Sequence, residues 1–133
     1  MWEQLKRLAE LGMLSVRNPK LTMHNLRLFC KNKYQRMVRG WSDYDAYNFN
    51  DWFLSVVPDM LKHMKENLQS TPISIELDEW EDTLEKMETC FRNADIDNTD
   101  VNEVPNGDIG TYCQNNLDEG MELLKVWFWE LWD

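Results

Sequence analysis

The chain has 133 residues, which suits one domain with a single hydrophobic core. Seven Trp, four Tyr and five Phe give it more apolar surface than a disordered chain has, so an intrinsically disordered protein is excluded. The formal net charge of −10 is unevenly distributed: residues 1–40 contain nine Lys and Arg against two acids, and residues 41–133 contain five against twenty-two.

This asymmetry predicts one helical domain, 1–133, made of a basic helical arm (1–40) and an acidic helical body (41–133). An acidic body repels nucleic acid and attracts basic surfaces, so we expect a protein with a basic surface as its partner and not nucleic acid. In the arm, apolar residues at three-residue steps predict a short helix over 2–11, which Gly12 would end.

A second helix is predicted from Thr22 to about Val38. Apolar residues recur within it at three- and four-residue steps and form one face. They are Leu26, Phe29, Cys30, Tyr34 and Met37. The basic residues between them are typical of the solvated back of an ordinary helix.

The same basic residues also allow a different interpretation, a nucleotide-binding protein of the kind that sequesters small nucleotides. Lys33, Arg36 and Arg39 would hold phosphate. An aromatic ring would then stack on the base, and the candidates are Trp41 and Tyr44.

The strongest helix signal covers about 43–68, after a stop at Gly40. Ser42 is expected to cap this helix, and Asp45, three residues on, makes a short version of the capping box. Pro58 lies in the middle of the pattern. Because proline lacks an N–H and clashes with the carbonyl four residues back, we expect a kink or a break into two helices there.

Three acids, Asp43, Asp45 and Asp51, lie in the first turns of this helix. One interpretation is a metal-dependent enzyme that uses these carboxylates. The other is structural, because acids at a helix N-terminus complement its dipole. We favour the structural one, since neither His24 nor His63 is close in sequence to complete a catalytic group.

A further helix is predicted to begin at Asp78, with Glu81 at the capping-box distance. Its buried side is expected to hold Trp80, Leu84, Met87 and Phe91. The exposed side is almost purely acidic, and it is our first candidate surface for a partner. Its residues are Glu79, Asp82, Glu85 and Glu88.

Residues 93–110 are predicted to be an irregular acidic loop. Its start resembles a calcium loop, but Asp100 replaces the required glycine and Asn106 the required glutamate, so we do not expect calcium. The last helix should run from about 108 or 111 to 132. Apolar residues surround much of it, so it is either central or meets another chain through its tryptophans. These candidates for partner binding or self-association are Trp127, Trp129 and Trp132.

Cys30, Cys90 and Cys113 are odd in number and far apart, which predicts neither a zinc site nor a disulfide framework. Reduced thiols indicate the cytoplasm. The sequence shows no secretion signal and no apolar run long enough to span a membrane, so we expect no membrane partner, and we expect no cofactor.

Four short segments resemble a widespread set of small helical proteins encoded by bacteriophages. The segments are Lys33-Tyr34-Gln35-Arg36 and Arg39-Gly40-Trp41-Ser42-Asp43-Tyr44-Asp45, followed by Asp78-Glu79-Trp80-Glu81 and a closing Leu131-Trp132-Asp133. The similarity covers roughly 33–92 and 117–133 and departs from the set at 69–77 and in the first 30 residues. It implies a phage source and a helical architecture, and no established activity.

The expected fold is therefore all-α, a bundle of four to five helices with one irregular acidic loop. The expected function is that of a non-enzymatic phage accessory protein in the host cytoplasm. It would bind and inhibit a host protein, as anti-defence proteins or nucleic-acid mimics do. The nucleotide-binding protein and the metal-dependent enzyme are the two alternatives.

Overall fold

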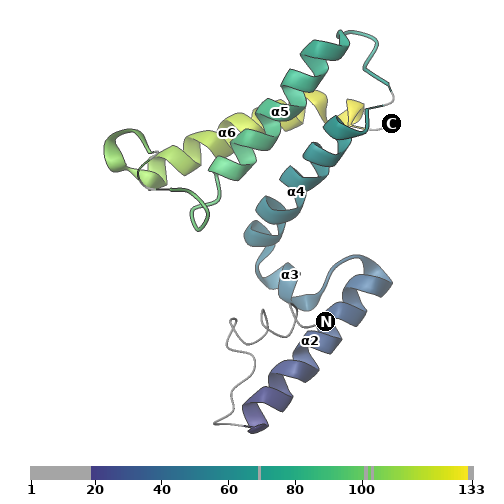
Figure 1. Ribbon diagram of the computed structural model, residues 1–133, viewed down its shortest axis with the longest axis vertical. Helices are drawn as coiled ribbons and strands as arrows, with labels where there is room; N and C mark the ends of the chain where they lie inside the picture. The colour runs from purple at the N-terminus through teal and green to yellow at the C-terminus, as the bar shows by residue number, and fades with distance from the viewer. Residues whose placement is uncertain (1–18, 69, 101, 103, 132–133) are drawn as a thin grey trace. The chain divides into compact units, whose positions relative to one another are not determined.

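The computed structural model describes residues 19–68, 70–100, 102 and 104–131 (Figure 1). The short helix predicted over 2–11 lies outside these residues. The chain forms two compact units, residues 1–49 and 50–133, each of which is treated by itself. We name them the first unit and the second unit. The described residues are all-α and contain no strand, as the sequence predicts.

The first unit contains α2 (Pro19–Arg39) and α3 (Asp43–Tyr47). The second unit contains α4 (Phe49–Glu66, from its second residue on), α5 (Leu77–Asn93) and α6 (Ile109–Trp127). Two single 3-10 turns, η2 (Pro105–Gly107) and η3 (Phe128–Glu130), precede and follow α6. Of the helices that the structure describes, none is both long enough and apolar enough to cross a bilayer.

The turn between α2 and α3 depends on one glycine and one capping serine. Gly40 has φ +82°, a left-handed conformation that glycine adopts without strain, and its N–H bonds the carbonyl of Arg36 at 3.0 Å. Ser42 then caps α3, and Asp45 completes the predicted capping box. The capping prediction is confirmed.

The single helix predicted over 43–68 is divided, but not at Pro58. α4 continues through Pro58, whose ring is fully buried, so the predicted break there is wrong. The division lies at Asn48, whose backbone N–H and side-chain Nδ2 both bond the carbonyl of Tyr44, at 3.0 and 3.1 Å. The backbone bond is the last helical bond of α3, because Asn48 leaves the helical conformation, with φ −117° and ψ 56°, one turn after α3 begins.

The core of the second unit is centred on α5. Leu61 of α4 joins the four residues predicted for the buried side of α5, which are Trp80, Leu84, Met87 and Phe91. The predicted cap at Asp78 is wrong, because α5 begins at Leu77 and Glu76 occupies the cap position without a side-chain bond. The N–H of Trp80 already bonds the carbonyl of Glu76 at 2.9 Å, so Asp78 lies inside the first turn.

α5 and α6 lie side by side and antiparallel (Figure 1). Trp80 at the start of α5 meets Trp127 at the end of α6, with ring centroids 5.4 Å apart. α6 begins at Ile109, within the predicted range for its start, and Asp108 caps it. It ends at Trp127, earlier than the predicted 132, and tightens into η3. Val126 and Trp129 are exposed, so α5 and not α6 is the central helix. That the exposed tryptophan meets another chain stays a prediction.

Gly120 allows a close approach of α6 to α5. A Cβ at this position would lie 3.0 Å from Cε1 of Phe91 and 3.2 Å from Cβ of Cys90, and both of these residues are buried. Helix propensity favours alanine over glycine by about 1 kcal/mol, but crowding of a packed core costs about 1–3 kcal/mol.

We therefore expect Gly120→Ala to lower the free energy of unfolding of the second unit by about 1 kcal/mol, and Gly120→Val to lower it further. Gly110→Ala is the matched control, because its Cβ would meet only a side-chain oxygen of Asp108 at 3.7 Å. The control should be neutral or stabilising. Chemical denaturation followed by circular dichroism measures all three, and a stabilising Gly120→Val would contradict the close packing.

Candidate functional site

Most of the residues first considered for phosphate or metal binding form a junction of ion pairs between α2 and α3. Arg36 donates from Nε to Oδ2 of Asp45 at 2.8 Å, and its second guanidinium nitrogen pairs with Oδ1. The same Oδ2 accepts from the N–H of Ser42 at 2.7 Å and from its hydroxyl at 2.8 Å. Ser42 and Asp45 are both buried. Asp45 is thus a structural acceptor at the centre of the junction.

This environment favours the charged carboxylate of Asp45. The hydrogen bond from Arg36 is the main reason that the pKa of Asp45 lies well below its usual range, and the N–H and hydroxyl of Ser42 lower it further. Burial opposes them but is outweighed. In return, the same bond raises the pKa of Arg36.

Asp43 forms the exposed half of the junction. It accepts from Nε2 of Gln35 and pairs with Nζ of Lys31, both at 2.8 Å, and it also pairs with Arg39. These hydrogen bonds, that of Gln35 first, hold the pKa of Asp43 well below its usual range. The guanidinium of Arg39 lies 3.9 Å from the ring centroid of Trp41. One face of that ring is therefore occupied by a side chain of the same chain.

The structure thus gives internal partners to three of the five residues of the phosphate-binding hypothesis, Arg36, Arg39 and Trp41. Of the other two, Lys33 lies over the ring of Phe29 and Tyr44 is exposed. Nothing in this arrangement favours a phosphate over the carboxylates already bound.

The carboxylates of the metal-dependent alternative are also engaged. Asp43 and Asp45 pair with arginines in the first unit, and Asp51, in the second unit, accepts from Nδ2 of Asn50 at 2.8 Å. Within the described part of the chain, no group of three or more His, Cys, Asp or Glu residues could hold a metal ion. The structure therefore supplies no observation in favour of this alternative.

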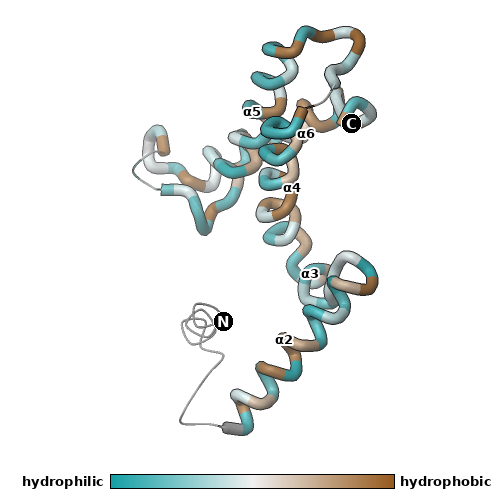
Figure 2. Tube along the Cα trace, turned by 45° about the vertical axis from the view of Figure 1, so that its right-hand side comes forward, coloured by the Kyte–Doolittle hydropathy of each residue, from teal (hydrophilic) through white to brown (hydrophobic). Residues whose placement is uncertain are grey.

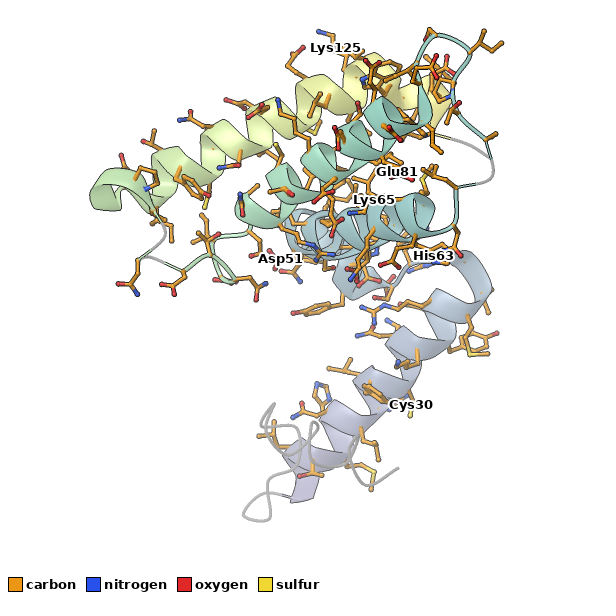
Figure 3. All side chains as sticks on the ribbon, turned by 45° about the horizontal axis from the view of Figure 1, so that its top comes forward. Cys30, Asp51, His63, Lys65, Glu81 and Lys125 are labelled. Carbon is orange, nitrogen blue, oxygen red and sulfur yellow. The ribbon has the colours of Figure 1, made fainter. Side chains whose placement is uncertain are left out.

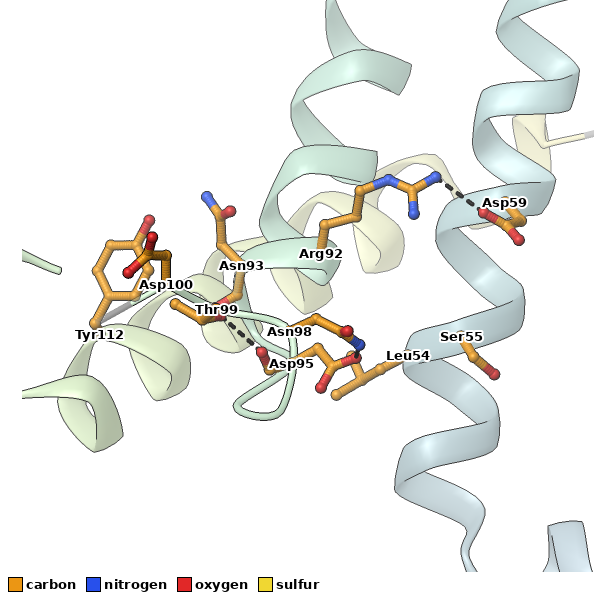
Figure 4. Close-up of a pocket in the computed structure, with 10 residues that line it drawn as sticks. All are labelled: Leu54, Ser55, Asp59, Arg92, Asn93, Asp95, Asn98, Thr99, Asp100 and Tyr112. Carbon is orange, nitrogen blue, oxygen red and sulfur yellow. Dashed lines mark hydrogen bonds and ion pairs between the residues drawn. The ribbon is translucent and has the colours of Figure 1, made fainter. Parts of the chain in front are cut away.

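A pocket of about 440 Å³ opens beside the loop that follows α5 (Figure 4). Its charged groups are already engaged: Arg92 bonds Asp59 at 2.9 Å, and Asp95 accepts from Nδ2 of Asn98 at 2.5 Å. Asp100 likewise accepts from the backbone N–H of Asn102 at 2.9 Å. The first of these bonds joins α5 to α4 and the other two lie within the loop, so they leave few free groups for a ligand.

Two of the four acids predicted as partner contacts on α5 are instead part of the fold. Glu88 accepts from Nε of Arg92 at 2.8 Å and pairs with Lys65 of α4 at 3.7 Å, and its side chain is only 12% exposed. Glu85 pairs with Lys65 at 3.5 Å. Both therefore link α4 to α5.

The other two, Glu79 and Asp82, are exposed and form no ion pair with any described residue. They belong to a run of five acids without a base, here named the acidic end of α5. Its members are Glu76, Asp78, Glu79, Glu81 and Asp82, all of them exposed. Sequence reasoning missed three of these as contacts, although five acids among the seven residues 76–82, with no base between them, were the signal.

The tryptophans also divide. Trp127 is half-buried against Trp80, whereas Trp129 is 80% exposed and touches Phe128 edge to face, with centroids 5.2 Å apart. Because α5 and α6 are antiparallel, these exposed rings lie at the same end of the second unit as the acidic end of α5 (Figure 1). Trp132, the third predicted contact, lies outside the described residues.

Comparison of the chain with protein-family models, with curated proteins and with solved structures gave no match. The functional conclusion therefore rests on the geometry and charge described above.

Proposed function

We propose that this chain is a non-enzymatic phage accessory protein that binds a host protein with a basic surface and inhibits it. The observation that supports binding is the acidic end of α5, where five exposed acids have no basic residue among them. The phage source rests on the resemblance carried by Arg39-Gly40-Trp41-Ser42-Asp43. The host cytoplasm is the place where such a protein would act.

Clustered carboxylates attract a basic surface over roughly a Debye length, about 8 Å at physiological salt. Charge of this kind increases the association rate and the selectivity for a partner more than it increases the affinity. An exposed ring supplies the tighter contact, and Trp129 at the same end of the unit is suited to it. A basic groove that normally holds nucleic acid is the surface that such a cluster would occupy.

Binding is favoured over catalysis for a further reason. Of the three carboxylates that the sequence offers for catalysis, Asp43 and Asp45 are neutralised by arginines, and Asp51 lies in the other unit. The buried thiol of Cys90 is not a ready nucleophile either, because burial raises its pKa and keeps it protonated.

The test compares two double variants with the same change in charge. Glu79→Lys with Asp82→Lys reverses the acidic end of α5, and Asp97→Lys with Asp118→Lys reverses exposed acids elsewhere in the second unit. Proteins captured from host lysate by the immobilised chain are compared at low and high salt. We expect a basic protein that high salt releases and whose affinity falls at least about tenfold with the first variant only.

Inhibition is then measured on the captured protein, with the unaltered chain and with each variant added to its activity assay. Equal loss of capture with both double variants would show that net charge alone acts. Equal retention would show that the acidic end of α5 is not the contact. Either result would overturn the proposed surface.

A further inference from the structure

α2 presents a narrow apolar stripe to solvent, formed by Met23, Leu26, Cys30, Tyr34 and Met37 and here named the α2 stripe. Met23 is 69% exposed, Tyr34 67% and Met37 85%. Hydrophobic and hydrophilic positions alternate along the helix (Figure 2), and Cys30 projects from it (Figure 3). The members are spaced by three, four, four and three residues, so at 3.6 residues per turn they fall within an arc of about 80°.

The spacing of the α2 stripe indicates what covers it. Its members recur at 11-residue intervals, Met23 to Tyr34 and Leu26 to Met37, and such an interval keeps an apolar line nearly parallel to the helix axis. Val38, 67% exposed, widens the apolar surface only in the last turn. One helix laid along Met23 to Met37 would cover the whole stripe.

The charges of α2 indicate the charge of the helix that would cover the stripe. α2 has six Lys and Arg and no acid. Three of the bases, Lys31, Arg36 and Arg39, pair with Asp43 or Asp45. The others have no acidic partner among the described residues, and they are Lys20, Arg27 and Lys33.

The three bases without an acidic partner lie on the two edges of the α2 stripe. By helical geometry Arg27 and Lys20 follow the edge at Tyr34, and Lys33 follows the edge at Leu26. Cations at both edges of an apolar seam match acids at the flanking positions of a second helix.

We propose that the α2 stripe docks an acidic amphipathic helix of a partner protein. This is an interaction surface of the first unit, separate from the acidic end of α5 and independent of the function proposed above. The stripe takes the apolar side of the partner helix, and Arg27 and Lys33 take its flanking carboxylates.

Three other occupants fit less well. A second copy of α2 brings six more bases and no acid, so the pair would repel. A nucleic acid would neutralise the bases but leave the α2 stripe in water. A bilayer surface takes helices whose apolar residues gather on one side, whereas Leu21 and Leu28, both exposed, lie on the side of α2 opposite the stripe.

The test uses the full chain and a fluorescent peptide of three heptads, with leucine at the seam positions and glutamate at the flanking ones. We expect anisotropy to report binding in the micromolar range, and a peptide with serine in place of leucine to bind at least about tenfold more weakly. Leu26→Ser should weaken binding of the leucine peptide about tenfold. Arg27→Gln with Lys33→Gln should weaken it and reduce its salt dependence.

Leu28→Ser is the matched control. Leu28 is 43% exposed and Leu26 45%, but Leu28 lies on the opposite side of α2, so binding should stay within about twofold. All altered residues are exposed, and circular dichroism checks that the helix content is unchanged.

Equal binding of the leucine and serine peptides, or equal effects of Leu26→Ser and Leu28→Ser, would overturn the proposal. Anionic vesicles or duplex DNA that bind with the same dependence on Leu26, while the leucine peptide does not, would assign the surface to them instead. Self-association that Leu26→Ser abolishes in sedimentation, without peptide binding, would assign it to a second copy. None of these outcomes bears on the α5 charge reversals, so the two proposals fail separately.

Discussion

Phe91→Ala is expected to lower the free energy of unfolding of the second unit by about 3–5 kcal/mol, the usual cost of removing a buried aromatic ring. The ring of Phe91 is fully buried and meets the ring of Phe53 edge to face, with centroids 5.3 Å apart. It also lies against Gly120, so α4, α5 and α6 all contact it. The free energy of unfolding of a small domain is about 5–15 kcal/mol in total, so this one substitution removes a large part of it.

Thermal unfolding followed by circular dichroism measures the effect, and the expected fall in Tm is roughly 15–30 °C. Phe128→Ala removes the same side chain from a position that is 56% exposed in η3. Its Tm should change by less than about 5 °C. A similar fall for both variants would mean that the second unit is not built around α5.

Phe91 belongs to the part of the fold that the sequence predicts well. Trp80, Leu84, Met87 and Phe91 recur at steps of four, three and four, and this period exists because one side of α5 is buried. The same holds for Ser42 and Asp45, which are three residues apart and cap the same helix. Interactions within one or two helical turns leave a readable pattern.

The division of the helix over 43–68 is not readable in this way. Local chemistry disfavours Pro58 inside a helix, yet its ring is fully buried in α4. Burial within the second unit offsets the lost N–H, and the sequence around Pro58 does not contain that information. At Asn48 the backbone leaves the helical conformation and the side-chain Nδ2 bonds the carbonyl of Tyr44, although no proline or glycine marks this position in the sequence.

The candidate site shows the same limit. The acids of α5 look alike in sequence, but Glu88 is tied to Lys65 of α4 and Glu79 is free of any described ion pair. The difference depends on a lysine more than twenty residues away, which only the packing of α4 on α5 brings near. Likewise, Arg36 and Asp45 are nine residues apart and belong to different helices. From the sequence, Arg36 was a candidate phosphate ligand and Asp45 a candidate metal ligand. The turn between α2 and α3 brings them together, and the sequence pattern does not show this.

Two surfaces of opposite sign follow from this sorting of charges. In each unit, some ionised side chains form ion pairs between helices, and the other ionised side chains face solvent beside apolar groups. On the second unit these solvent-facing side chains are the acids beside Trp129, and on the first unit they are the bases beside the α2 stripe. Charge beside exposed apolar surface is typical of protein docking, where the apolar part supplies affinity and the charge supplies selection.

Asp45→Ala is expected to destabilise the junction of the first unit by about 2–4 kcal/mol. Loss of the capping box costs about 1 kcal/mol, and the buried N–H and hydroxyl of Ser42 lose an acceptor at about 1–3 kcal/mol. The ion pair adds little more, because the side chain of Arg36 is 46% exposed. Among the described residues of this unit, the buried side chains are those of Ser42 and Asp45, so no apolar core compensates.

Amide hydrogen exchange over residues 40–47 measures the loss, and protection should fall roughly 30-fold or more in Asp45→Ala. Asp43→Ala is the control, since Asp43 is half exposed and should contribute less to the stability of the junction.

The dependence of protection on pH provides a second test of Asp45. The pKa of Asp45 is lower in the folded chain than its ordinary 3.8. The contribution of Asp45 to the stability of the junction is therefore complete above pH 3.8 and is lost as the pH falls below that value. Protection, corrected for intrinsic exchange, should therefore decline below about pH 4 in the unaltered chain. Asp45→Ala should show a smaller decline, and an identical decline in both chains would mean that Asp45 does not hold the junction.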